Sequence, residues 1–171
     1  MDSSGELLFT ILSSLAQEES RNISENTTWG IRSNFKRGRP HINTKQLMGY
    51  KKDADGNLVI DENQAWIVRR VYREFLSGVS PLDIAKSLNH DGINGVHGKP
   101  RWVKVTILRM LTNEKYVGDL LMQKTYTKDY LNKVQVKNNG EVEQYFIRDN
   151  HPAIISRDDW DRVQRMLEND K

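Results

Sequence analysis

Apolar residues near the start of the chain recur at the spacing of a helix. Leu8, Ile11, Leu12 and Leu15 fall on one helix face, and no proline interrupts the segment from residue 3 to about 36. The second half of this segment is mostly polar. A helix of about 34 residues is roughly 50 Å long. We therefore predict a long helix whose apolar first half packs against a partner surface, and whose polar second half crosses open space.

The middle of the chain predicts a hairpin and then three helices. Two short apolar segments flank the turn sequence at 53–57, which indicates two strands joined by a turn. Each helix has a capping residue or a broad apolar face. The three helices are expected between Asp61 and Gly78, between Ser80 and Gly92, and from about Trp102 to Thr112.

Strands are expected again toward the end of the chain. Segments 117–123 and 142–147 have strand character, and the polar, basic stretch 124–140 between them is predicted to be a loop. Ser156 opens a last helix as its N-cap. The predicted fold class is α+β and mostly α. A long N-terminal helix precedes a compact helical domain with a helix-turn-helix-like pair and a small antiparallel sheet.

Composition narrows the class of protein. The 171 residues include no cysteine, which excludes disulfides, thiolate zinc sites and cysteine nucleophiles. No apolar run approaches the ~20 residues of a membrane span. Acidic Asp2 and Glu6 stand where a signal peptide would be basic. We therefore expect a cytoplasmic protein without a membrane partner.

Charge alternates in blocks along the chain. The net charge is +3, but residues 21–52 carry +7 and residues 97–137 carry +6, between three acidic blocks. Clustered lysine and arginine of this kind is typical of proteins that bind nucleic acid. A solvated lysine-rich surface is the alternative.

Motifs for metal, cofactor or catalytic chemistry are missing from the sequence. Asp53, Asp55 and Asn57 match the first ligand positions of a calcium loop, but Leu58 replaces its glycine and Gln64 its bidentate glutamate. The four histidines lack ligand spacing, and no nucleophile elbow, P-loop or dinucleotide motif occurs. We expect no metal and no cofactor, and an autonomous hydrolase is improbable.

The helix pair between Ser80 and Thr112 resembles a helix-turn-helix, although its connector is longer than the usual turn. A plain helical core with a basic face is the alternative. An arm with Arg37 and Arg39 follows the long helix, and such arms enter A·T-rich minor grooves. Five residues of the second helix of the pair lie on the face opposite its apolar side, or at the margin of that face. These candidate DNA contacts are Lys104, Val105, Thr106, Leu108 and Arg109.

Several spaced segments resemble the large serine recombinases, which are the integrases of phages and other mobile elements. The long helix that ends their catalytic domain is matched by Gly5-Glu6-Leu7-Leu8, Leu15-Ala16-Gln17-Glu18-Glu19-Ser20 and Ile23-Ser24. The "recombinase" domain that follows is matched by Gly49-Tyr50, Ile84-Ala85, Leu88-Asn89, Gly92-Ile93, Trp102, Thr106-Ile107, Leu111-Thr112-Asn113 and Tyr116-Val117-Gly118. Two departures are Val103, where a capping serine is common, and Glu114, which replaces a frequent proline.

The resemblance implies three parts: a connecting and dimerisation helix at 1–36, an extended basic arm at 37–48, and a DNA-binding domain at 49–171. The implied function is sequence-specific binding of double-stranded DNA at one half of an attachment site. The helix end with Arg32 and Lys36 would lie over the minor groove.

The resemblance also implies that the domain with the nucleophilic serine precedes residue 1, so this part alone is expected to be inactive in site-specific recombination. Glu19 matches a glutamate near the active site of small resolvases, although Ser20 replaces the arginine usually beside it. Self-association through the long helix is expected in the full-length protein. A helix-turn-helix transcriptional regulator with a dimerising helix is the alternative function.

Overall fold

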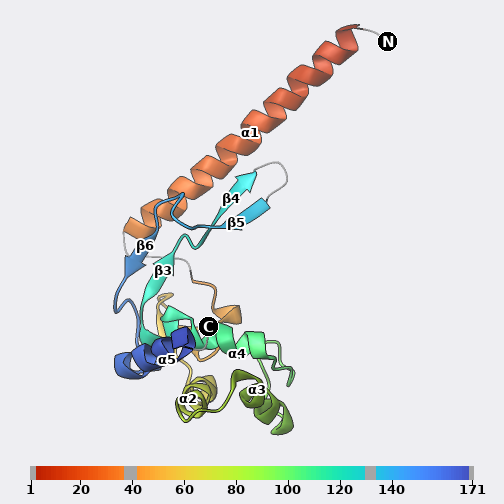
Figure 1. The fold of residues 1–171 in the computed structure, drawn as a ribbon. Helices are drawn as coiled ribbons and strands as arrows, with labels where there is room; N and C mark the ends of the chain where they lie inside the picture. Colours follow the sequence, from red (N-terminus) through yellow and green to blue (C-terminus); the bar gives the residue numbers. More distant parts are fainter. Residues whose placement is uncertain (1–2, 37–41, 130–133, 170–171) are drawn as a thin grey trace. The chain divides into compact units, whose positions relative to one another are not determined.

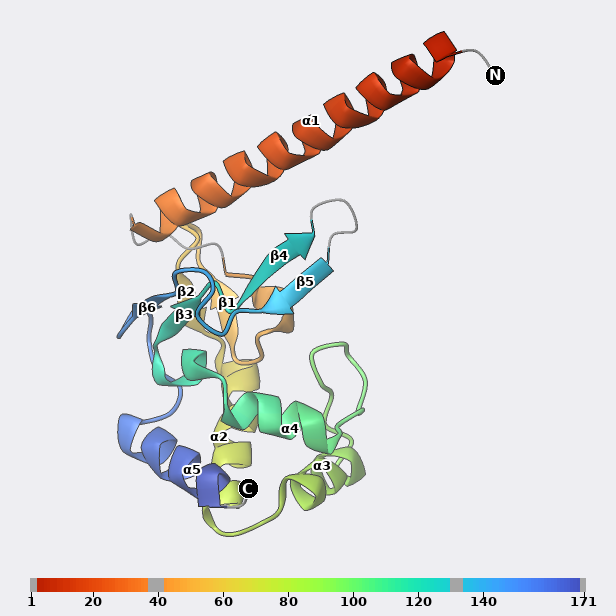
Figure 2. The same cartoon turned by 45° about the horizontal axis from the view of Figure 1, so that its top comes forward.

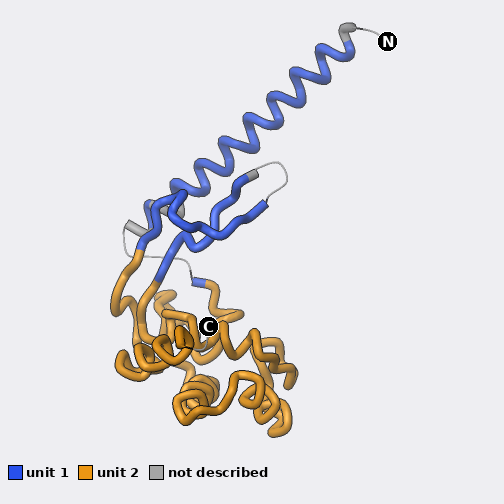
Figure 3. The backbone as a smooth tube through the Cα atoms, in the orientation of Figure 1, with its two compact units in different colours: residues 1–42, 121–145 blue, residues 43–120, 146–171 orange. Residues whose placement is uncertain are grey.

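The structure is a computed structural model that describes residues 3–36, 42–129 and 134–169. The chain divides into two compact units, coloured separately in Figure 3. Unit 1 comprises residues 1–42 and 121–145, and unit 2 comprises residues 43–120 and 146–171. The chain therefore leaves unit 2, builds part of unit 1, and returns.

Unit 1 contains the predicted long helix. α1 spans Ser3–Lys36, as expected from its periodicity (Figure 1). Its apolar side chains between Leu7 and Ile23 are exposed, and Leu8, Leu12 and Leu15 are each more than half exposed. The apolar half of α1 therefore packs against nothing within the described part of this chain.

The loop predicted over 124–140 is wrong, because that segment holds a β-hairpin. β4 (Thr125–Asp129) pairs antiparallel with β5 (Val134–Lys137), with Tyr126 opposite Val136. β5 alternates valine with polar residues, and β4 begins with the β-branched and aromatic run Thr125, Tyr126 and Thr127. Both patterns favour strands, but the lysines around them favoured the prediction of a polar loop. Asn138 closes the hairpin: its buried side-chain amide donates to the Gln123 and Val142 carbonyls at 2.9 and 2.6 Å.

The strands predicted around this hairpin are present but shorter. β3 spans Leu120–Met122 and β6 spans Tyr145–Ile147, and both lie where the chain passes between the units. Val117, predicted as the start of the first strand, instead ends the 3-10 helix η2 (Glu114–Val117). η2 ends at Gly118, whose φ of 88° favours glycine, and a Cβ there would lie 2.7 Å from the His151 carbonyl oxygen.

Unit 2 begins with a short 3-10 helix and the predicted hairpin. η1 (Thr44–Gln46) leads to β1 (Tyr50–Lys52), which pairs antiparallel with β2 (Leu58–Ile60). In the turn between these strands, the Asp53 carboxylate accepts the backbone N–H groups of Asp55 and Asn57. The aspartate that suggested a calcium loop is thus used to shape a turn.

Four helices complete unit 2. They are α2 (Glu62–Leu76), α3 (Pro81–His90), α4 (Lys104–Leu111) and α5 (Arg157–Asn169). α2 and α4 each contact the other three helices and together form the centre of the core (Figure 2). The largest fully buried side chains are Tyr72, Ile84, Leu88, Ile107, Leu111, Val68, Val71 and Val163. The α+β, mostly α fold class is confirmed.

The caps of these helices follow the sequence with one difference. Ser80 caps α3 by accepting the Asp83 N–H, and Ser156 does the same for Asp159 at α5. At α2 the cap Asp61 accepts from the Asn63 N–H, whereas the Gln64 side chain accepts the Gly49 N–H at 3.2 Å. Asp61 and Gln64 have the spacing of a capping box, but Gln64 instead ties α2 to the residue that precedes β1. No helix within the described ranges is both long and apolar enough to cross a membrane.

Candidate nucleic-acid interface

The short helix α4 buries one face and exposes the other. Ile107, Met110 and Leu111 are buried, as is Trp102 just before the helix. Opposite them, the outward residues predicted from the sequence are exposed or half-buried: Lys104, Val105 and Arg109 are exposed, and Thr106 and Leu108 are half-buried. The predicted division of α4 into an inner and an outer face is therefore confirmed.

Asn89 of α3 fixes the start of α4. Its side-chain amide donates to the Trp102 carbonyl at 2.8 Å, and its oxygen accepts the Trp102 backbone N–H at 2.7 Å. The Trp102 indole N–H in turn donates to the Ile93 carbonyl at 2.7 Å. Val103, the N-cap of α4, has no side chain that can accept a hydrogen bond. The α3–α4 clamp, which we define as Asn89 with Trp102, compensates for that missing cap.

Two side chains hold the other end of α4. The buried Tyr72 hydroxyl of α2 donates to the Met110 carbonyl at 3.0 Å, and Gln164 of α5 donates to the Leu111 carbonyl at 2.8 Å. These are the carbonyls that a helix C-terminus leaves without an intrahelical partner. Burial raises the pKa of Tyr72 far above its usual range, so its hydroxyl stays a donor. α4 is thus held at both ends by three other helices.

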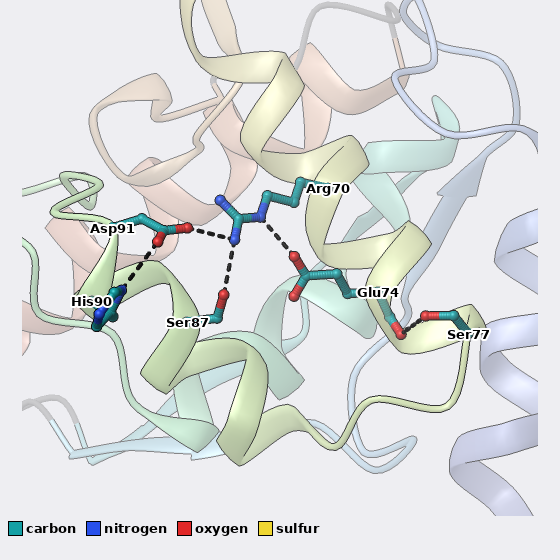
Figure 4. A network of polar contacts seen from close by, with 6 residues as sticks. All are labelled: Arg70, Glu74, Ser77, Ser87, His90 and Asp91. Atoms are coloured by element: carbon teal, nitrogen blue, oxygen red, sulfur yellow. Dashed lines mark hydrogen bonds and ion pairs between the residues drawn. The ribbon is translucent and has the colours of Figure 1, made fainter.

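A half-buried arginine holds α3 against α2. Arg70 of α2 donates to the carboxylates of Glu74 and Asp91, at 2.6 and 2.7 Å, and to the Ser87 hydroxyl at 2.8 Å (Figure 4). The Arg70 guanidinium holds the pKa of Asp91 below its usual range. Because both carboxylates neutralise this cation, it offers no free charge to a partner.

The connector from α3 to α4 forms a turn of its own rather than a tight helix-turn-helix corner. The Gly95 N–H donates to the Lys99 carbonyl at 2.9 Å, and the Gly98 N–H donates to the Gly95 carbonyl at the same distance. This turn brings Lys99 and Arg101, both exposed, to the edge of α4. The sequence analysis did not single out these two cations, although they belong to the basic block 97–137.

Unpaired positive charge gathers around α4. Within the described ranges, no carboxylate forms an ion pair with Lys99, Arg101, Lys104 or Arg109. Several cations elsewhere in unit 2 are neutralised by carboxylates. These pairs include Arg69–Glu62, Arg70–Glu74, Lys86–Asp83 and Arg157–Asp119. Free cations beside an exposed helix face suit a polyanionic partner.

The remaining predicted site residues lie in the first part of the chain. Glu19 is exposed on α1, and Arg32 and Lys36 lie in the last turns of that helix. Arg37 and Arg39 fall outside the described residues. The structure therefore brings together the five α4 candidates but tests no contact between any candidate and DNA.

A second polar cluster joins the residues around η2 to the start of α5. Asp119 is buried and accepts two hydrogen bonds from Arg157, one at 2.8 Å, which hold its pKa below the usual range. His151 is half-buried and donates from Nε2 to the Lys115 carbonyl at 2.7 Å, and burial lowers its pKa. Both side chains are occupied by internal contacts. Within the described ranges, no three His, Asp or Glu side chains could hold a metal ion.

The chain resembles known proteins along most of its length. It is 29% identical over 175 residues to a Bacillus subtilis (strain 168) protein described as "Putative DNA recombinase", an alignment that covers 95% of this chain and 34% of the relative. One similar solved structure is described as "Sequence Requirements of the Listeria innocua prophage attP site". It has a TM-score of 0.55 and 24% identity, and the match covers 84% of this chain and 51% of that one.

A second solved structure, described as "Crystal Structure of a LSR-DNA Complex", has a TM-score of 0.49 and 24% identity over 75% of this chain and 33% of that one. The chain thus spans between a third and about half of the length of these proteins. A family model described as Recombinase matches residues 62–170, which include α2, α3, α4 and α5. Since this match covers more than half of the chain, the protein belongs to the Recombinase family.

Proposed function

We propose that this chain binds double-stranded DNA at one half of an attachment site, as the DNA-recognition part of a serine recombinase of the integrase type. The observation that carries the proposal is the outer face of α4. This face is largely exposed, carries Lys104 and Arg109, lies beside Lys99 and Arg101, and belongs to a helix fixed at both ends. None of these four cations is ion-paired with another described residue. A rigid helix with these properties can enter the major groove as one body.

Different residues of α4 would make different kinds of contact with DNA. Val105 and Arg109 are four positions apart and form the outermost line of the helix. Arginine reads guanine through two hydrogen bonds, and an apolar side chain contacts the thymine methyl group. Lys104 at the start of α4 would contact a phosphate and set the register. Thr106 and Leu108 flank this line and would contribute at its margins.

The first part of the chain would add contacts with DNA and with other parts of the recombinase. We propose that residues 1–36 connect to the catalytic part of the recombinase and to a second protomer through the exposed apolar residues of α1. The predicted arm, residues 37–48, would follow the minor groove at Arg37 and Arg39, whereas Leu47 and Met48 at its end are buried in the core. Residues 49–171 would form the DNA-binding domain. Arg32 and Lys36 would contact phosphates, and Glu19 would be a remnant beside the active site. This activity would take place in the cytoplasm, in contact with the DNA of the host and of the mobile element.

A binding titration tests this function. A labelled duplex carrying the attachment sequence, and a scrambled duplex of equal length, are titrated with the chain at several salt concentrations. If about 5–8 phosphates are neutralised, log affinity falls with a slope near −5 to −7 against log salt. The cognate duplex should bind more tightly at every salt concentration. A slope shallower than about −2, or equal affinity for both duplexes, would contradict the proposal.

A supercoiled plasmid with two attachment sites tests whether this chain binds DNA without cutting it. We expect the chain to bind the plasmid but to leave its topology unchanged, because strand cleavage is assigned to the catalytic part of the recombinase. A covalent adduct between a serine of this chain and DNA would overturn this part of the proposal.

A further inference from the structure

A groove separates α4 and its connector from the end of η1 and the residues just after it. Its volume is about 700 Å³, and all of its lining residues belong to unit 2. One wall is formed by α4 and the connector, and the other by Gln46 and Met48. The buried side chains of Trp102, Met110 and Tyr116 form an apolar floor.

The lining of the groove is positive. Lys99, Arg101 and Arg109 line the groove, and none of the three is ion-paired within the described ranges. Gln46, Thr106 and Asn113 add uncharged polar groups, and His97 also lines the groove. Among the residues that the structure describes, no aspartate or glutamate lines it. Three unpaired cations without a carboxylate among them favour an anionic occupant.

The position of the groove indicates which anion it holds. Thr106 and Arg109 lie on the groove side of α4, so the groove borders the face proposed for the major groove. Its opposite wall, Gln46 and Met48, comes a few residues after Arg37 and Arg39, which are proposed for the minor groove. On a DNA duplex, the neighbouring major and minor grooves are separated by one sugar–phosphate strand. A protein that reads both grooves must cross that strand.

We propose that this groove binds the sugar–phosphate strand between the two DNA grooves, with Lys99 and Arg101 as its phosphate contacts. This inference rests on the proposed function and deepens it. The long connector then has a purpose that a tight helix-turn-helix corner could not serve, because its turn carries two cations to the backbone beside α4. Lys99 and Arg101 provide affinity without sequence preference, whereas the outer face of α4 selects the sequence.

The test compares two double variants that remove the same positive charge. Lys99→Gln with Arg101→Gln neutralises the groove. Arg73→Gln with Arg165→Gln removes two charges from exposed positions on α2 and α5, which do not line the groove. Each variant of the full chain is titrated by fluorescence anisotropy against a labelled 30-base-pair duplex of scrambled sequence in about 50–300 mM KCl. Far-UV circular dichroism melts check that each variant folds.

Loss of two phosphate contacts should make the salt slope of the groove variant shallower by about 2, since each contact contributes roughly 0.9. At 100 mM KCl its affinity should fall about tenfold or more, by the same factor on scrambled and attachment DNA. The α2/α5 control should change the slope by less than about 0.3. The charge-preserving pair Lys99→Arg with Arg101→Lys should retain the wild-type slope.

The possible outcomes distinguish a failure of the groove proposal from a failure of the proposed function. If the groove variant and the α2/α5 control show equal slopes and affinities, the groove proposal is wrong while DNA binding stands. A loss confined to attachment DNA would also overturn it, because it would make these cations base-reading residues. If the wild-type chain fails to bind either duplex, the proposed function itself fails.

Discussion

Replacing Asn89 by alanine should loosen α4 more than any exposed change on that helix. The variant loses both hydrogen bonds of the α3–α4 clamp, at 2.8 and 2.7 Å, and leaves the Trp102 N–H and carbonyl without these partners. A neutral hydrogen bond contributes roughly 0.5–1.5 kcal/mol, and an unsatisfied buried group raises the cost. We expect the free energy of unfolding to fall by about 2–3 kcal/mol. For a domain of roughly 100 residues this lowers Tm by roughly 10–20 °C.

Thermal unfolding followed by circular dichroism, together with a DNA titration, measures the effect. Asn89→Asp keeps the acceptor for the Trp102 N–H but loses the donor, so it should show about half the loss. Asn94→Ala is the matched control, because Asn94 is an exposed connector residue, and a surface change of this kind costs less than roughly 0.5 kcal/mol. Duplex affinity should fall for Asn89→Ala even well below its Tm, since α4 loses its fixed start. Melting of Asn89→Ala at the wild-type temperature would refute this reasoning.

Four further changes test other parts of unit 2. Tyr72→Phe removes the hydroxyl that holds the end of α4, and should lower the free energy of unfolding in urea by about 1 kcal/mol. Asp119→Asn breaks the pair with Arg157 and should cost about 2–3 kcal/mol. Because the folded-state pKa of Asp119 is lowered, its contribution is present above about pH 4 and lost as pH falls further, so the variant should lose less stability in acid than wild type. The pKa of His151 is also lowered, so the unfolded chain binds the extra proton and stability should fall as pH drops below about 6.5; His151→Gln should flatten Tm between pH 7.5 and 5. Arg109→Ala should weaken attachment DNA by about 1–3 kcal/mol in an anisotropy titration, and equal wild-type and variant affinities would remove it from the interface.

Local signals in the sequence were sufficient for most helices. The extent of α1 follows from uninterrupted periodicity, and the starts of α3 and α5 follow from the caps Ser80 and Ser156, which act within one helical turn. The inner and outer faces of α4 follow from the same periodicity. Each of these features depends on residues close together in the chain, so the pattern of apolar and polar positions was enough to predict them.

The groups that fix α4 could not be predicted in this way. Asn89 and Trp102 are 13 positions apart, and Tyr72 is 38 positions from the carbonyl that it holds. These contacts depend on how α2, α3 and α4 pack. The same holds for Lys99 and Arg101, since only the folded connector shows that they border α4 without ion-pair partners. The β4–β5 hairpin was missed for a different reason, because its alternating pattern is short and contains several lysines.

The way α4 is held has a consequence for how such proteins diverge. The clamp at its start and the tyrosine and glutamine at its end bind backbone atoms, and its packing uses only the inward side chains. No hydrogen bond that fixes the helix depends on the side chain of Val105 or Arg109. Mutations at these positions can therefore accumulate with little effect on folding. Under the proposed function, related chains can acquire new target sequences on an unchanged scaffold. The outer face of α4 is then the natural place to randomise in a library that selects for binding to a new DNA sequence.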